Sequence, residues 1–508
     1  MLKIDLLVFN GHVITCDDDF KDVTAFTVHN GRFLTVAEEP DNLLEPERAI
    51  DLEGKTVIPG FFDGHTHLSQ TGFARKFHLN LDDVKSRTEF LERVEERVKS
   101  NPEEWLIARG WDESMWDDPE LVTLEEFDAV TGGKPAVARR IDGHTSLVNT
   151  RALELLAIPF EHEGVEKDVN GLFTGYLKDI DLRKRLPESP PQMMDESILD
   201  VCYWANSLGI TSACEMTGSV EPDDTTFTKI ISSYFRVKDR MTVRVCLYPS
   251  VQTISQLADS GLGPLGDDML RICGQKLFLD GSFGAKTAAI TQGYDDGSKG
   301  LDLTPEAAEL VKQVASTGWQ STMHAIGDRG IARAVEIIES VGISGLRIEH
   351  VEFLDAGLLE RLARANVFLS MQPNFNQWAH EGGLYENRIG NSRLKLNPFR
   401  KVIDSGITLA FGSDGMPMDP LLGIYHAVNH PVPEFTLTPE QAIKAYTLGA
   451  ARATGVAGDR GSISPGKLAD FVVLDKNPLT VGKGTLKDIK VVQTFLGGKK
   501  VYPYSKTQ

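Results

Sequence analysis

Short apolar runs with the character of β-strands recur through the middle of the chain and alternate with stretches of helical pattern. Such alternation is typical of a parallel sheet built from repeated βα units. Eight runs can be placed, which is the number of parallel strands that closes a (β/α)8 TIM barrel. They cover residues 57–63, 210–215, 243–248, 272–279, 320–324, 346–350, 367–371 and 408–414. We therefore predict an α/β fold with a TIM barrel as its main domain.

Both ends of the chain differ from this middle part, because they contain short strand-like runs without a long helical period. Residues 5–56 carry Asn-Gly and Glu-Gly turn signals, and residues 469–475 and 491–496 are two further strand-like runs. We predict that residues 1–58 and 460–508 pair into one small β-sandwich and that residues 59–459 form the barrel.

The first and second runs lie roughly 145 residues apart, which is too far for a single helix and its loops. A TIM barrel can carry such extra sequence as an insertion in the loops where its strands end. We place the insertion after the first barrel strand, at residues 74–197, and expect it to lie over the mouth of the active site.

The formal net charge of -20 and the sequence pI of about 5.1 bear on possible partners. Nucleic-acid binders usually present a basic surface, so we expect no nucleic-acid partner.

No segment approaches the roughly 20 consecutive apolar residues that span a bilayer, so we expect no membrane association. Asp5 interrupts what would be the apolar core of a signal peptide, and the five cysteines form no Cys-x-x-Cys pair. We expect a soluble, cytoplasmic protein that acts on a small molecule; whether it forms a homo-oligomer stays open.

The strongest local signal is the end of the first run, where residues 58–67 read Ile-Pro-Gly-Phe-Phe-Asp-Gly-His-Thr-His. Residues two apart on an extended backbone point to the same side, so His65 and His67 can face one ion from the carboxyl end of the strand. Two histidines can lie near a turn by chance, but the strand beneath them and the preceding Pro-Gly favour a metal site.

Three later runs also end in residues that can bind a metal, namely His324, His350 and Asp414. One such histidine alone would more often be a core residue, and an Asp before Gly is often a turn residue. TIM-barrel active sites are assembled from the carboxyl ends of strands, so positions distant in sequence converge there. These three residues therefore join His65 and His67 as candidate metal ligands.

The segment Pro-Gly-Phe-Phe-Asp-Gly-His-Thr-His at 59–67 resembles the first metal motif of the amidohydrolase superfamily. The likeness runs nearly end to end, through Gly-Ser-Ile-Ser-Pro-Gly-Lys-Leu-Ala-Asp-Phe-Val-Val-Leu-Asp at 461–475, and narrows to the amidohydrolase-3 branch with its YtcJ-like proteins and N-substituted formamide deformylases. The resemblance implies a metal-dependent hydrolase with one or two divalent ions, zinc foremost. Asp414 matches the superfamily's final acid. Its carboxylate would bind the ion and, as general base, accept a proton from water whose pKa zinc lowers toward roughly 7.

Lys276 lies in the fourth run, where a barrel interior would normally disfavour charge. Burial lowers the pKa of a lysine, and the neutral amine can react with carbon dioxide to give a carbamate, an anionic ligand that can bridge two ions. Resemblance to binuclear amidohydrolases supports Lys276 as this carboxylated ligand. The alternatives are that Lys276 pairs with Asp280 or Glu215, that the Cys214 thiolate replaces the carbamate, or that only one metal is bound.

Four residues are candidates for substrate binding. Trp111 and His144 lie in segments that resemble stretches which this branch places in the insertion; Trp111 could form an apolar wall and His144 could donate a hydrogen bond to a substrate carbonyl. Both residue types also serve in domain packing. Gln372, with its neighbour Asn374, and Arg388 follow the seventh run and are polar candidates without an assigned role.

Together these residues predict a metal-dependent hydrolase of carbon–nitrogen bonds other than peptide bonds, in an amide, formamide or cyclic amide. The metal would polarise the carbonyl, water would attack it, and Asp414 would pass a proton to the departing nitrogen. One alternative is a deaminase of a heterocyclic substrate, which would use the same groups and release ammonia. Another is a non-catalytic scaffold of the same fold, although every expected ligand position is filled.

Overall fold

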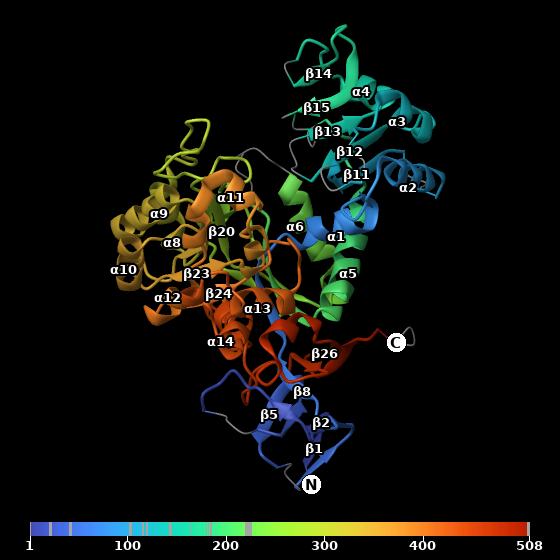
Figure 1. The fold of residues 1–508 in the computed structure, drawn as a ribbon. Helices are drawn as coiled ribbons and strands as arrows, with labels where there is room; N and C mark the ends of the chain where they lie inside the picture. The colour runs from blue at the N-terminus through green and yellow to red at the C-terminus, as the bar shows by residue number, and fades with distance from the viewer. Residues whose placement is uncertain are drawn as a thin grey trace. The chain divides into compact units, whose positions relative to one another are not determined.

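The chain forms two compact units, Met1–Ser69 with Ile198–Gln508, and Gln70–Ser197 (Figure 1). This computed structural model describes residues 2–19, 23–39, 43–100, 104–113, 116–117, 120–141, 145–162, 164–178, 180, 182, 185–218 and 226–504. Helices α1 (Leu68–Phe77) and α5 (Pro191–Ser207) contain the two boundaries between the units. None of the helices in these ranges is long and apolar enough to cross a membrane.

The larger unit contains the predicted TIM barrel. Its strands are β9 (Phe61–Thr66), β16 (Ile210–Met216), β17 (Arg244–Tyr248), β20 (Gly274–Phe278), β21 (Gln320–Ala325), β22 (Arg347–His350), β23 (Phe368–Met371) and β24 (Thr408–Phe411). They pair in parallel as β9-β16-β17 and as β20-β21-β22-β23-β24. A parallel bridge between Ser250 and Lys276 joins the two groups, and the Asp414 backbone N–H donates to the His65 carbonyl oxygen at 2.7 Å on the other side. The sheet is thereby closed, and the predicted fold is confirmed.

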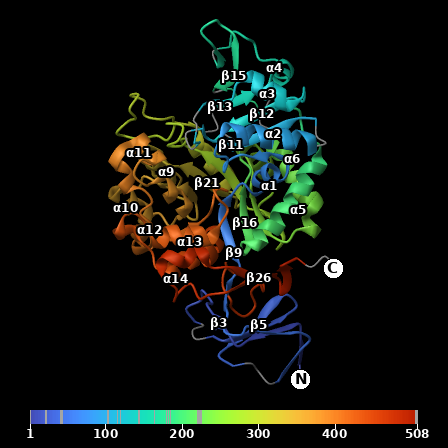
Figure 2. The same ribbon diagram turned by 45° about the vertical axis from the view of Figure 1, so that its right-hand side comes forward.

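Helices follow these strands and lie on the outside of the barrel (Figure 2). Helix α9 (Asp328–Val341) buries Ile331, Ala334, Val335 and Ile338 and ends at Gly342, whose φ is 65°. Their three- and four-residue spacing places them on one helical face, and burying each isoleucine stabilises the fold by about 1.5–3 kcal/mol. The other helices of the unit are α6 (Thr226–Val237), α7 (Val251–Asp259), α8 (Ala307–Ala315), α10 (Ala356–Arg364), α11 (Leu384–Ile389), α12 (Phe399–Asp404), α13 (Pro420–Val428), α14 (Pro439–Lys444) and α15 (Ala450–Ala453).

The first predicted run, 57–63, divides between two sheets at Gly60. Strand β8 (Thr56–Pro59) belongs to the small sandwich, where it pairs with β25 (Phe471–Leu474), whereas β9 belongs to the barrel. At the break, the Gly60 backbone N–H donates to Asp470 and that of the next residue donates to Gly209. A Cβ atom at Gly60 would come within 2.0 Å of Thr211 Oγ1, so this crossing between sheets requires glycine.

The fourth predicted run, 272–279, also divides. Its start belongs to β19 (Leu270–Ile272), which pairs with β17 and with β18 (Leu265–Gly266), and β20 pairs with β21. A Cβ atom at Gly274 would lie 2.0 Å from the Gln320 carbonyl oxygen. The predicted run thus pairs with β17 before Gly274 and with β21 from Gly274 onward, where β21 approaches closely.

Both ends of the chain form one β-sandwich, as the sequence predicts. One sheet has the order β5-β4-β2-β7 and the other β27-β26-β25-β8-β3. Phe26, Phe33, Phe471 and Phe495 pack between them, and the Phe471 and Phe495 rings stack with centroids 4.3 Å apart. The strands are β2 (Leu6–Phe9), β3 (His12–Val13), β4 (Ala25–His29), β5 (Arg32–Ala37), β7 (Ala49–Asp51), β26 (Val491–Leu496) and β27 (Lys499–Tyr502), and a separate pair joins β1 (Leu2–Ile4) to β6 (Leu44–Pro46).

The smaller unit, Gln70–Ser197, has its own sheet and its own core. The strand order is β10-β11-β12-β13-β15-β14. Helix α3 starts with a capping box between Thr123 and Glu126 and ends at Gly132, whose φ is 59°. The elements are β10 (Leu79–Asn80), α2 (Arg87–Ser100), β11 (Leu106–Trp111), α3 (Leu124–Thr131), β12 (Ala136–Arg140), β13 (Thr145–Val148), α4 (Thr150–Leu156), β14 (Val165–Lys167) and β15 (Phe173–Lys178).

Candidate metal centre

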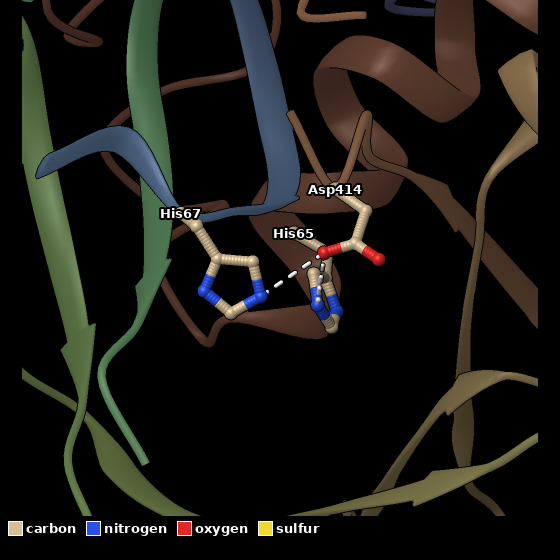
Figure 3. A group of neighbouring side chains, drawn as sticks. All are labelled: His65, His67 and Asp414. Carbon is tan, nitrogen blue, oxygen red and sulfur yellow. Dashed lines mark ion pairs between the residues drawn. The ribbon is translucent and has the colours of Figure 1, made fainter. Parts of the chain in front are cut away.

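His65, His67 and Asp414 come together where the first and last barrel strands end (Figure 3). Asp414 Oδ1 lies 3.4 Å from His65 Nε2 and 3.1 Å from His67 Nε2. The atoms that the three side chains offer as ligands all lie within 4.8 Å of one another. Figure 3 shows one carboxylate oxygen facing both rings. Two imidazoles and a carboxylate that converge in this way are suited to a divalent metal ion.

Asp63 holds the ends of these two strands together. Its carboxylate accepts hydrogen bonds from the backbone N–H groups of His65, at 3.3 Å, and Ser413, at 2.9 Å, and from Ser413 Oγ at 2.5 Å. Burial raises the pKa of Asp63 to about 6, although these hydrogen bonds oppose the rise. At Gly412 a Cβ atom would meet the His65 nitrogen at 2.3 Å. Asp63 and Gly412 therefore set the position of Asp414 relative to His65.

Two more histidines lie beside this group. The ring centroids of His65 and His350 are 4.8 Å apart, and those of His350 and His324 are 4.3 Å apart. His350 Nδ1 lies 2.8 Å from Gln372 Oε1, and His324 Nε2 lies 3.0 Å from the Gly281 carbonyl oxygen. These contacts leave His350 Nε2 and His324 Nδ1 as the nitrogens that could bind a metal.

The charge state of these two histidines suits metal binding. Burial lowers the pKa of His324 to about 3, and Lys276 acts in the same direction. Burial also lowers the pKa of His350 well below its ordinary value. Both imidazoles are therefore neutral near pH 7, which is the form that binds a metal ion.

Lys276 lies on β20 and its side chain is buried, with 2% of its surface exposed. Burial lowers the pKa of Lys276 to about 8, although the charges of Glu349 and Asp414 oppose this change. The segment after β16 packs against it, since a Cβ atom at Gly218 would lie 2.5 Å from Lys276 Cβ.

The alternative partners of Lys276 are engaged elsewhere. Asp280 accepts hydrogen bonds from the backbone N–H groups of Ala289, Ile326 and Gly327. Glu215 accepts hydrogen bonds from Ser69 and from the Tyr234 hydroxyl. Within the described ranges, no ion pair joins Lys276 to Asp280 or Glu215.

The Cys214 thiol does not belong to the group formed by His65, His67 and Asp414. Its Sγ lies 3.3 Å from Thr454 Oγ1 and 3.5 Å from Arg347 Nη1. Burial raises the pKa of Cys214 to about 12, which disfavours the thiolate form that binds zinc.

The predicted substrate-binding residues lie in different parts of the structure. Trp111 is 1% exposed in the core of the smaller unit, where its indole N–H donates to the Ala138 carbonyl oxygen at 3.2 Å. Gln372 contacts His350, and Arg388 on α11 donates to the Gly284 carbonyl oxygen at 3.0 Å. Asn374 donates to the carbonyl oxygen of Pro417. His144 lies outside the described residues.

Two functional candidates escaped the sequence interpretation, namely Arg347 and Glu349 on β22. His65 Nδ1 lies 2.6 Å from Glu349 Oε2, and Arg347 Nε lies 2.5 Å from Glu349 Oε1. Burial opposes ionisation of Glu349, but Arg347 and His65 hold its pKa well below the ordinary value. The signal in the sequence was two charged residues at alternate positions just before His350.

The chemistry of these side chains fits a divalent ion such as zinc. Asp414 Oδ1 is buried without a hydrogen-bond partner, and it faces the two histidines of β9. Metal-binding histidines generally have their second nitrogen hydrogen-bonded to a carboxylate or carbonyl oxygen, which fixes the tautomer. His65, His324 and His350 each have an oxygen partner of this kind.

Comparisons with known proteins show what the chain is similar to. A family model described as "Amidohydrolase family" matches residues 48–502. The chain is 28% identical to Protein LONG AFTER FAR-RED 3 of Arabidopsis thaliana, over 98% of this chain and 92% of that protein. It is 29% identical to the putative amidohydrolase YtcJ of Bacillus subtilis (strain 168), over 90% of each chain. It is 24% identical to the N-substituted formamide deformylase of Arthrobacter pascens, over 99% of each chain.

The fold is likewise similar to a solved structure. An uncharacterized metal-dependent hydrolase from Pyrococcus horikoshii OT3 superposes with a TM-score of 0.79 at 26% identity, covering 94% of this chain and 99% of that one. These matches confirm the resemblance drawn from the sequence motifs. The chain belongs to the amidohydrolase family.

Proposed function

We propose that the chain hydrolyses a carbon–nitrogen bond of a small amide, formamide or cyclic amide with the help of one or two divalent metal ions, zinc foremost. The observation that carries this proposal is the convergence of His65, His67 and Asp414. His324, His350 and Lys276 complete the proposed set of ligands. When bound, the metal supplies Lewis acidity, which polarises a carbonyl group and lowers the pKa of water.

Asp414 is the proposed general base. Burial opposes ionisation of its carboxyl group, but the contacts with His65 and His67 hold its pKa well below the ordinary value. The ionised carboxylate can therefore accept a proton from the attacking water. Asp414 then passes this proton to the departing nitrogen, which leaves as an amine.

Lys276 is proposed to act as a carbamate. Its ammonium group would first lose a proton to solvent, and the neutral Nζ would then attack carbon dioxide and lose a second proton, so that a buried cation becomes an anionic oxygen ligand. Its buried position supports this assignment, and so do the hydrogen bonds that engage Asp280 and Glu215 with other groups. A carbamate at Lys276 would supply an anionic oxygen ligand to a divalent metal held by the histidines of β9, β21 and β22.

Support for an amide-type substrate comes from the relative named N-substituted formamide deformylase, which matches this chain over its whole length. A screen of N-substituted formamides, N-acyl amino acids and cyclic imides tests the proposal. Release of amine or carboxylate, measured for each substrate, would support it. Release of ammonia from heterocyclic amines instead would identify a deaminase.

Metal content provides the accompanying test. We expect the purified protein to contain one or two equivalents of zinc, or of a substitute such as manganese or iron, and chelation to abolish turnover. Added zinc should restore it. Undiminished turnover in metal-free protein would overturn the proposed function.

A further inference from the structure

A pair of fully buried charges lies in the barrel interior next to the candidate metal centre. Arg347 and Glu349, both on β22, have no solvent-exposed side-chain surface, and Arg347 Nε lies 2.5 Å from Glu349 Oε1. Removing two charges from water costs several kcal/mol per ion, and their mutual attraction often fails to repay it. Two apolar residues would fill the same space at less cost, so stability alone does not account for this pair.

Glu349 connects the pair to a candidate metal ligand. One carboxylate oxygen, Oε2, lies 2.6 Å from His65 Nδ1, and the other accepts a hydrogen bond from the Thr322 hydroxyl. Arg347 Nη2 also donates to Oε2 at 3.1 Å, so both carboxylate oxygens already act as acceptors, and this geometry assigns the ring proton of His65 to Nδ1. The lone pair is then on Nε2, the nitrogen that faces Asp414 Oδ1 at 3.4 Å.

Arg347 connects the pair to the backbone of the His-Thr-His segment. Its Nη2 donates to the Gly64 carbonyl oxygen, immediately before His65, and to Ser370 Oγ at 3.1 Å. Its Nη1 contacts Cys214 Sγ at 3.5 Å. One side chain on β22 thus contacts β9, β16 and β23, and it fixes the position of β9 where the ligands begin.

We propose that Glu349 and Arg347 are positioning residues for the metal ligand His65, with Glu349 fixing its tautomer and ring orientation and Arg347 fixing both Glu349 and the backbone at Gly64. This inference rests on the part of the proposed function that assigns metal binding to the centre. It does not depend on which bond is hydrolysed.

The contrast with the other histidines supports this role. Gln372 Oε1 and the Gly281 carbonyl oxygen contact His350 and His324, and both of these partners are neutral. On the nitrogen that faces away from the centre, His65 has a carboxylate oxygen at 2.6 Å, whereas the carboxylate oxygen beside His324 Nε2, Asp280 Oδ1, lies farther away at 3.6 Å. A carboxylate partner makes an imidazole a stronger ligand, and loss of such a partner typically weakens metal affinity by about 10–100-fold.

The test compares two charge-neutral double variants. Arg347→Met with Glu349→Leu removes both charges and the acceptor for His65, whereas Arg347→Met with Glu349→Gln removes both charges but keeps an acceptor oxygen. Neither leaves an uncompensated buried charge, so both should fold. The matched control is Arg361→Met with Glu339→Gln, which removes an exposed pair whose Nη2–Oε2 distance is 2.7 Å.

Three quantities are measured: the zinc Kd of the apo-protein by competition with a chromogenic chelator, the Tm of the apo-protein, and the visible absorption spectrum of the cobalt-loaded protein. We expect the Leu double variant to bind zinc about 10–100-fold more weakly with an altered cobalt spectrum. The Gln double variant should recover part of this loss, and the control should match the wild type.

A purely structural pair would change the Tm and leave the other two quantities alone. Wild-type zinc affinity and cobalt spectrum in the Leu double variant would overturn the inference. If that variant does not fold, the same result in the Gln double variant would overturn it. A wild-type protein that binds no zinc would instead overturn the proposed function, whereas one that binds zinc without hydrolysing the screened substrates leaves this test intact.

Discussion

The candidate ligands are prepared for a metal ion by the hydrogen bonds behind them. His65, His324 and His350 each have one ring nitrogen against an oxygen atom, which fixes the ring and leaves the other nitrogen available to a metal. Asp414 stays ionised because His65 and His67 offset the cost of its burial. Together with the lowered pKa values of His324 and His350, this gives these three ligands the protonation states that bind a metal, which lowers the cost of organising the site.

Asp414 carries the first residue-level prediction. Asp414→Asn keeps the size of the side chain and one carbonyl oxygen as a ligand, but an amide cannot accept the proton. We expect the variant to fold and to retain much of its zinc, and kcat to fall by about 10²–10⁴-fold. Zinc content by elemental analysis and steady-state kinetics on the same sample provide the check. Near-normal kcat in a zinc-loaded Asn variant would remove Asp414 from the role of base.

Lys276 carries the second residue-level prediction. Lys276→Ala should lose metal and activity, and added acetate or propionate should restore a fraction of both by occupying the vacated ligand position. A cation beside a bound metal would repel it by roughly 4 kcal/mol per unit charge at 4 Å and an effective dielectric constant of 20. Lys276→Arg keeps that charge and should therefore not respond to carboxylates.

The outcome that contradicts the carbamate is an alanine variant that binds two metals and turns over normally. The bridging ligand would then be another residue. Cys214→Ala would be the next variant to measure, because a cysteine can replace the carbamate as a zinc ligand.

The sequence predicted which side chains lie together at the strand ends better than it predicted the residues behind them. His65, His67 and Asp414 could be placed together because strand ends of a barrel converge, which is a property of the fold. The role of Glu349 could not be read in this way, since an alternating Arg-Ile-Glu-His run also describes a strand with one face in water. Only the closed barrel shows that this face is interior.

At the level of elements, the strands carry the ligands and glycines fix where strands change partners. The predicted runs 320–324 and 408–414 correspond to β21 and to β24 with its following turn, because an apolar run ending in a polar residue marks a strand end. The divisions at Gly60 and Gly274 were not predictable. They depend on Thr211 and Gln320, which approach from other strands and leave no local signal in the sequence.

Gly274 provides an element-level prediction. A Cβ atom there would lie 2.0 Å from the Gln320 backbone oxygen, so Gly274→Ala must separate β20 from β21. We expect a loss of stability of about 1–3 kcal/mol or more, as for overpacking in a core. Gly458→Ala is the control, because no atom lies within 4 Å of the added Cβ. Urea unfolding followed by circular dichroism gives the comparison, and equal midpoints for the two variants would contradict the prediction.

At the level of the whole larger unit, the sandwich and the barrel are joined by both chain and side chains. The chain passes from β8 to β9 at Gly60. In addition, the hydroxyl of Thr494, in strand β26 of the sandwich, donates a hydrogen bond to the Asn206 carbonyl oxygen of α5 at 2.7 Å. The sandwich brings together segments from both ends of the sequence, with Phe26 and Phe471 in one core. The barrel that separates these segments in sequence therefore begins and ends on the same small domain.

A buried ion pair strengthens this junction. Arg244, the first residue of β17, directs Nε to Asp470 Oδ2 at 2.6 Å and Nη2 to Asp470 Oδ1 at 3.0 Å. Asp470 lies just before β25 and also accepts the Gly497 backbone N–H at 2.7 Å. The side chains of Arg244 and Asp470 are 9% and 5% exposed, so neither charge can be solvated if its partner is removed.

We therefore expect Arg244→Ala to lower the free energy of unfolding by about 3–5 kcal/mol, because it leaves the Asp470 carboxylate buried and unpaired. Arg244→Lys should lose less, since it keeps the charge but cannot make the two parallel hydrogen bonds. Arg400→Ala is the matched control: its Nε bonds Asp404 at 2.8 Å on the surface, and such exposed pairs contribute about 0–1 kcal/mol. Urea unfolding of the zinc-loaded proteins measures the differences.

Arg244 lies at the amino end of its strand, whereas the candidate ligands lie at or near the carboxyl ends of theirs. The zinc Kd should therefore not change in any of the three variants. Equal stability of the Arg244→Ala and Arg400→Ala proteins would show that the pair does not hold the sandwich to the barrel.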